Sequence, residues 1–118
     1  MKAALRISTL ALACSALAAP ALAAQPAAFA ACGACHTLDG AAGLGPTLKG
    51  VYGRKSGSLK GFAFSPAMKK AGVTWDDSAL DKFLTDPQKA VPGNVMPFPG
   101  VADAKQRAEI IDFLKTAK

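Results

Sequence analysis

The chain has 118 residues and carries 14 Lys and Arg against 8 Asp and Glu, for a formal net charge of +6. This length allows one small domain, and a composition of 51% hydrophobic and 19% charged residues is typical of a compact globular chain and excludes a disordered one. The basic residues form no run and are not interleaved with aromatic residues, so no nucleic-acid partner is expected.

Residues 1–23 have the pattern of a cleaved secretory signal peptide. Lys2 and Arg6 form a basic start, an Ala- and Leu-rich stretch follows over 7–19, and small residues end the segment at Ala23. The apolar stretch is too short to span a bilayer comfortably. The mature domain, residues 24–118, is therefore expected in the periplasm, without an integral membrane segment and with a net charge of +4.

The mature chain is predicted to begin with a short Ala-rich helix over 25–35, which runs into the motif Cys32-Gly33-Ala34-Cys35-His36. This spacing is that of c-type haem attachment, in which each thiol bonds one side arm of a haem and the histidine lies beneath the iron. Cys32 and Cys35 are thus candidates for the thioether bonds, and His36 for an axial ligand.

Other uses of this cysteine pair are less consistent with the sequence. A thioredoxin-like pair needs an α/β pattern, which is absent, and zinc needs a fourth ligand. A disulfide between the two is an alternative in an exported protein. Cys14 faintly resembles a lipoprotein attachment site, but it is predicted to be lost with the signal peptide.

The middle of the chain combines a long loop with two helices. Glycines recur through 37–61, which predicts a loop. Ser65-Pro66 is a good helix start and Gly72 a plausible stop, so a short helix is expected between them. A second helix is predicted from a capping box at Thr74 and Asp77, with an apolar stripe that ends before Asp86-Pro87.

Three prolines and two glycines in residues 91–100 exclude a helix or a central strand there. Asp103 can cap a final helix, whose apolar face is predicted to comprise Ala104, Ala108, Ile111 and Leu114, widened by Ile110 and Phe113. No segment alternates with the period of a strand, so the predicted fold is all-α with long loops.

His36 is the only histidine, so a second imidazole ligand within the chain is excluded. The remaining candidates for the sixth position are a methionine thioether, a lysine amine, water or no ligand. Met68 lies on a short helix, where methionine ordinarily fills a gap in the core. Met96 lies in the rigid Pro-rich loop, without a helical face to pack on, and is the preferred ligand.

From Cys32 to Lys115 the chain resembles the class I c-type cytochromes, of the mitochondrial type and their soluble bacterial relatives. The matching motifs are Gly45-Pro46, Gly53-Arg54-Lys55, Gly72-Val73-Thr74-Trp75, Asp86-Pro87, Pro92-Gly93 and Met96, in the family's order. The resemblance implies a small cytochrome c fold of about four to five helices, with long loops wrapped around one covalently bound haem c.

The resemblance also implies roles for individual residues. Cys32 and Cys35 would form the thioethers, and His36 and Met96 the axial bonds to iron. Pro46 would present its carbonyl to the outward nitrogen of His36, and Arg54 and Trp75 would lie near a haem propionate. Phe64 and Phe83 replace tyrosines of the mitochondrial relatives, and Met68 replaces an asparagine. These changes predict a drier pocket with a different potential, which a redox titration of Phe83→Tyr would test.

With both axial positions filled, the expected function is electron transfer and not enzymatic catalysis. The chain is expected to be a monomeric periplasmic shuttle in a respiratory chain, carrying single electrons from a quinol-oxidising complex or dehydrogenase to a terminal oxidase or reductase. Transient, acidic-surfaced redox partners would dock on a rim of lysines, predicted as Lys49, Lys60, Lys69 and Lys89. The alternatives are a haem peroxidase, if Met96 does not ligate, and a dedicated cytochrome subunit of a periplasmic dehydrogenase.

Overall fold

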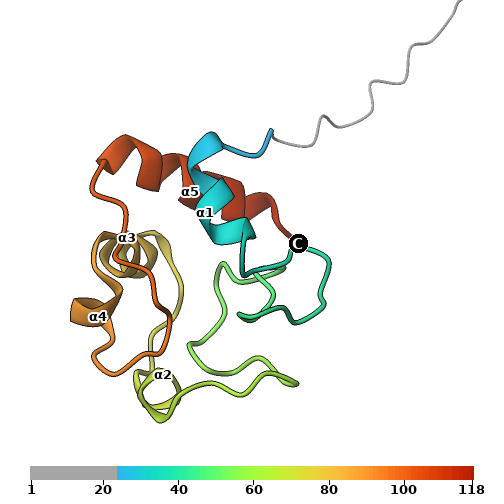
Figure 1. Ribbon diagram of the computed structural model, residues 1–118, viewed down its shortest axis with the longest axis vertical. Coiled ribbons are helices and arrows are strands. Elements are labelled where there is room, and N and C mark those ends of the chain that lie inside the picture. The colour runs from blue at the N-terminus through green and yellow to red at the C-terminus, as the bar shows by residue number, and fades with distance from the viewer. Residues whose placement is uncertain (1–23) are drawn as a thin grey trace, which may run out of the picture.

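The computed structural model describes residues 24–118, which form an all-α fold, as predicted (Figure 1). Its helices are a 3-10 helix η1 (Ala27–Phe29), α1 (Ala30–Gly33), α2 (Pro66–Lys70), α3 (Asp77–Thr85), α4 (Pro87–Ala90) and α5 (Ala104–Thr116). The β pairing within residues 24–118 is a single isolated bridge between Lys55 and Thr74. The predicted signal peptide and Cys14 lie outside the described residues.

Side-chain caps fix where the helices begin. Ser65 accepts a hydrogen bond from the Met68 amide at the start of α2, and Asp103 caps α5, both as predicted. The predicted start of α3 is wrong, because the capping residue is Asp76 and not Thr74. Thr74 is instead held in extended backbone by its bridge to Lys55. A tertiary contact thus overrides a local capping pattern.

Helix α4 was not predicted, because Asp86-Pro87 was interpreted only as the end of the preceding helix. Asp86 does end α3, but its side chain also accepts from the Lys89 amide and caps α4. Pro87 occupies the first turn of α4, where its missing N–H costs nothing. Asp86-Pro87 therefore ends α3 and starts α4, and the Pro-rich loop follows α4.

The core is built where the first and last helical segments meet. Phe29 is 1% exposed, and its ring packs edge-to-face on Phe113 with the centroids 4.9 Å apart. Ile110, Ile111 and Leu114 are the buried residues of α5, whereas Ala104 and Ala108 are exposed. The apolar face of α5 is therefore confined to its second half.

Figure 1 shows how these elements are arranged. Helices α1 and α5 cross at one end, α3 and α4 form one side, the green loop after α1 runs along the other side, and α2 lies at the opposite end. The end of α5 returns to this loop, where the Gly50 amide donates to the Ala117 carbonyl. Within residues 24–118, none of the helices is long and apolar enough to cross a membrane.

Candidate functional site

A cavity of about 480 Å³ lies between the crossing helices, the long loop, α2, α3 and the Pro-rich loop. Its volume is within the range of small-molecule and cofactor sites, roughly 300–1,000 Å³. Apolar side chains dominate the wall, and among the described residues the charged side chains that line it are Arg54 and Lys55. Such a wall suits a large apolar group with a small number of polar contacts.

The seven residues predicted to hold a haem all line this cavity: Cys32, Cys35, His36, Pro46, Arg54, Trp75 and Met96. They come from the end of α1, the long loop, the segment before α3 and the Pro-rich loop. The fold thus brings together residues that are far apart in the sequence.

His36 is held by backbone atoms of the long loop. The Pro46 carbonyl oxygen lies 2.7 Å from His36 Nδ1, the contact that the family resemblance implies. When Nδ1 carries the proton and donates to this carbonyl, Nε2 has a free lone pair, as a metal ligand requires. Gly45 permits this approach, because a Cβ atom there would lie 2.7 Å from Nδ1.

Cys32 and Cys35 are half-buried and are not bonded to each other. The Cys35 and His36 amides both donate to the Cys32 carbonyl, at 3.1 and 2.9 Å, so a single turn carries both thiols and the imidazole. Burial raises the pKa of the Cys32 thiol, which keeps it protonated at neutral pH. These two free thiols on the cavity wall fit the two thioether bonds of a haem c.

Arg54 and Trp75 supply the polar contacts of the cavity. The Arg54 guanidinium donates to the carbonyls of Thr47 and Lys49, both at 3.0 Å, and burial lowers its pKa without removing its charge. Trp75 is buried and lines the cavity, and its indole N–H is a hydrogen-bond donor. An anionic propionate would find one positive charge and one indole N–H here.

Two thioethers reach the cavity, because both Met68 and Met96 line it. Met68 belongs to α2, whereas Met96 lies in a segment without helix between α4 and α5. Phe64 and Phe83 line the cavity as well, so the three positions expected to depart from the mitochondrial relatives all present apolar side chains to it.

Part of the cavity mouth was not predicted from the sequence. Leu44 and Val95 also line the cavity, yet they are 85% and 76% exposed. Both lie in loops without periodicity, so no sequence pattern marks them. The four predicted docking lysines are exposed, and none of them lines the cavity, whereas Lys55 does.

Comparison with known proteins gives consistent results. The cytochrome c family model matches residues 22–118. Cytochrome c2 iso-2 of Magnetospirillum molischianum is 47% identical over 94 residues, which cover 79% of this chain and 97% of that protein. Cytochrome c of Euglena viridis is 47% identical over 87 residues, covering 73% and 85% of the two chains. The solved structure of cytochrome cH from Methylobacterium extorquens superimposes with a TM-score of 0.73 at 53% identity and covers 75% of this chain and 91% of that one.

Proposed function

Because this chain belongs to the cytochrome c family, we propose that it is a soluble periplasmic electron shuttle whose haem iron is bound axially by His36 and Met96. Family membership establishes one covalently bound haem c and an electron-carrier function, not an enzymatic one. When bound, the haem supplies one-electron redox chemistry at its iron. The observation that carries the proposal is the cavity, whose wall contains both thiols, the oriented imidazole and the Met96 thioether.

The protein's own residues set the conditions for this chemistry. The Pro46 carbonyl orients the His36 ring and raises the basicity of its other nitrogen. A thioether at the sixth position favours a high potential, and two filled axial positions leave no place for a substrate. Arg54 and Trp75 would hold the propionates, while the apolar wall excludes water from the rest of the site.

The proposed partners are acidic-surfaced redox proteins, and the charge distribution supports this. Between Gly40 and Trp75 there is no carboxylate, but this segment holds six basic residues: Lys49, Arg54, Lys55, Lys60, Lys69 and Lys70. In the rest of residues 24–118, carboxylates outnumber basic residues. The long loop and α2 therefore form a positive side, next to a cavity mouth whose exposed apolar residues are Leu44 and Val95.

We place the shuttle between a quinol-oxidising complex or a periplasmic dehydrogenase and a terminal oxidase or reductase of a respiratory chain. The signal-peptide pattern of residues 1–23 supports export to the periplasm. Transient docking of a monomer suits such a role, because rapid turnover requires weak complexes that are guided by charge.

The axial assignment is tested with two methionine variants. We expect the ferric wild-type protein to show the weak far-red charge-transfer band of an iron–sulfur bond. Met96→Ala should lose this band, whereas Met68→Ala, the matched control from the same cavity, should keep it. A high-spin ferric wild-type protein without the band would contradict the proposal and favour the haem peroxidase alternative.

A further inference from the structure

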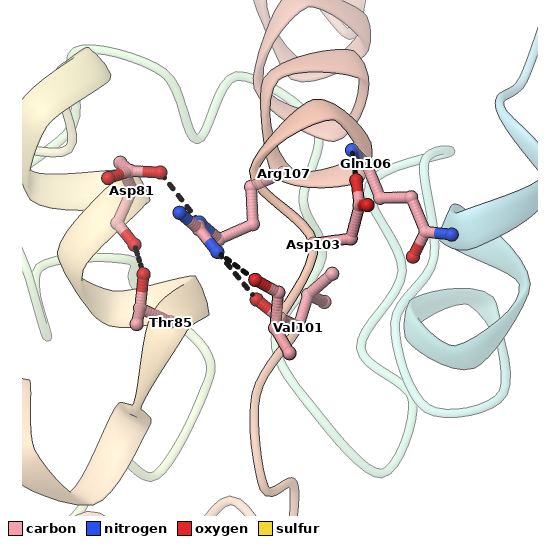
Figure 2. Close-up of polar contacts among 7 residues, drawn as sticks. Asp81, Thr85, Val101, Asp103, Gln106 and Arg107 are labelled. Carbon is pink, nitrogen blue, oxygen red and sulfur yellow. Dashed lines mark hydrogen bonds and ion pairs between the residues drawn. The ribbon is translucent and has the colours of Figure 1, made fainter.

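The loop that carries Met96 is fastened to the protein on both sides of this residue. On the C-terminal side of Met96, the Val101 amide donates to the Leu84 carbonyl at 2.7 Å. Arg107 donates through Nη1 to the Val101 and Ala102 carbonyls, both at 2.9 Å, and through Nε to Asp81, at 2.7 Å (Figure 2). The Arg107 side chain is 12% exposed, so this fastening ties α5, α3 and the end of the loop together.

On the N-terminal side of Met96, the Gln88 side chain donates through Nε2 to the Asn94 carbonyl at 2.9 Å, and the Asn94 side chain makes the bonds closest to Met96. Asn94 is 6% exposed, and its Nδ2 donates to the Pro87 carbonyl at 2.8 Å and to the Val91 carbonyl at 2.9 Å. Its Oδ1 accepts from the Met96 amide at 3.0 Å. Both donors of the amide and one acceptor site are thus used. The side chain joins helix α4 directly to the backbone of Met96.

The two fastenings differ in how directly they act on Met96. Asn94 bonds the Met96 amide itself, whereas Arg107 bonds carbonyls that lie five and six residues further on. Pro97 and Pro99 lie between, and neither has an N–H with which to bond the neighbouring structure. Within the described residues, the hydrogen bond that holds the Met96 amide is the one to Asn94.

We propose that Asn94 is a positioning residue that keeps the Met96 thioether at the sixth coordination position. The Arg107–Asp81 pair, by contrast, stabilises the fold and leaves the occupancy of that position unchanged. This inference rests on the proposed function, because it assumes that Met96 is the axial ligand. A purely structural role for Asn94 would weaken the fold without any selective effect on the iron–sulfur bond.

Imidazole binding to the ferric holoprotein separates these roles. Imidazole can bind only when Met96 has left the iron, so its apparent affinity scales with the population of that open state. Loss of the buried Asn94 hydrogen bonds should raise this population, so Asn94→Ala should bind imidazole about tenfold more tightly or better. Asp81→Ala, the matched control at the other fastening, removes the acceptor of Arg107 Nε and should stay within about twofold of the wild type.

The titration follows loss of the far-red iron–sulfur band, and urea unfolding of each holoprotein reports its global stability. Asn94→Ser replaces the amide with one hydroxyl that can still form part of these hydrogen bonds, so it should give an intermediate affinity, and it provides the test if Asn94→Ala fails to fold. Unchanged imidazole affinity in both Asn94 variants would overturn the inference, as would an equal rise in Asp81→Ala. If the wild type lacks the far-red band, Met96 is not the axial ligand, and the proposed ligation fails together with this inference. If the wild type has the band but the Asn94 variants bind imidazole as the wild type does, only this inference fails.

Discussion

At the scale of single residues, Gly45 determines how closely the loop backbone can approach His36. A Cβ atom at this position would lie 2.5 Å from Cε1 and 2.7 Å from Nδ1 of the imidazole, far inside van der Waals contact. We therefore expect Gly45→Ala to displace the ring and break its hydrogen bond to Pro46. A less basic imidazole donates less electron density to ferric iron, so the midpoint potential should rise and covalent haem content should fall.

A redox titration and a pyridine haemochrome assay of Gly45→Ala measure these two quantities. Gly33→Ala is the matched control, because the Cβ atom there would meet only Phe29, at 3.9 Å. The control should match the wild type in both measurements. Wild-type potential and haem content in Gly45→Ala would show that the loop adapts and that this glycine is not required.

The residues with reactive atoms were predictable from the sequence, because their chemistry depends on residue type and local spacing. Cys32, Cys35 and His36 share one turn, so three-residue spacing alone places them together. The exposure of Leu44 and Val95 depends instead on how two aperiodic loops lie against each other, which no local pattern encodes. The contacts of Asn94 likewise require that α4 end beside the loop.

At the scale of elements, the first helical segment depends on a single aromatic side chain. Together η1 and α1 span residues 27–33, too few to form a stable helix alone. Phe29 anchors them on α5, and Phe29→Ala should lower the free energy of unfolding by about 3–5 kcal/mol. Urea unfolding of the holoprotein measures this loss, with Lys105→Ala, at an exposed position of α5, as the control. Equal urea midpoints of unfolding for the two variants would disprove the anchoring role of Phe29.

A surface cluster joins α3, α5 and the long loop. Lys115 Nζ lies 3.0 Å from Asp77 and 5.6 Å above the Tyr52 ring, and hydrogen bonds from Lys115 and Tyr52 lower the pKa of the Asp77 carboxyl. A carboxyl whose pKa is lower in the folded state stabilises the fold above its ordinary value of 3.8. That contribution is lost as pH falls through the lowered pKa.

Asp77→Asn should therefore melt slightly below the wild type at neutral pH, and the difference should vanish once the pH is below the folded pKa of Asp77. Thermal melts over a pH series check this. Glu109→Gln, which removes a surface pair with its charges 3.9 Å apart, is the control and should follow the wild type throughout. A difference between Asp77→Asn and the wild type that persists in acid would exclude this carboxylate as its source.

The helices with strong local patterns were predictable, and the exceptions have physical causes. The predictions for α2 and α5 were correct because Ser65 and Asp103 cap them locally. Thr74 has the residue type of a cap, but its bridge to Lys55 connects segments that are distant in sequence. Helix α4 shows that a proline after a helix can open a second one when the preceding aspartate caps it.

At the scale of the whole molecule, the positive side formed by the long loop and α2 should guide acidic partners. Replacing Lys60 and Lys69 together with alanine should slow electron transfer with an acidic copper protein at low salt, and the difference should fade as salt screens the charges. Lys105→Ala, on α5, is the control and should leave the rate unchanged. An equal slowing by Lys105→Ala would mean that net charge, and not this side, guides docking.

The proposed electron-carrier function requires that both axial positions of the haem iron be filled by side chains of the protein. Absorption spectra of the purified protein in both oxidation states, recorded with and without carbon monoxide, test this most directly. We expect a low-spin ferric spectrum with the far-red iron–sulfur band, and a ferrous spectrum that carbon monoxide does not change. A high-spin ferric haem that binds carbon monoxide once reduced would contradict the account, because it would show an open coordination position.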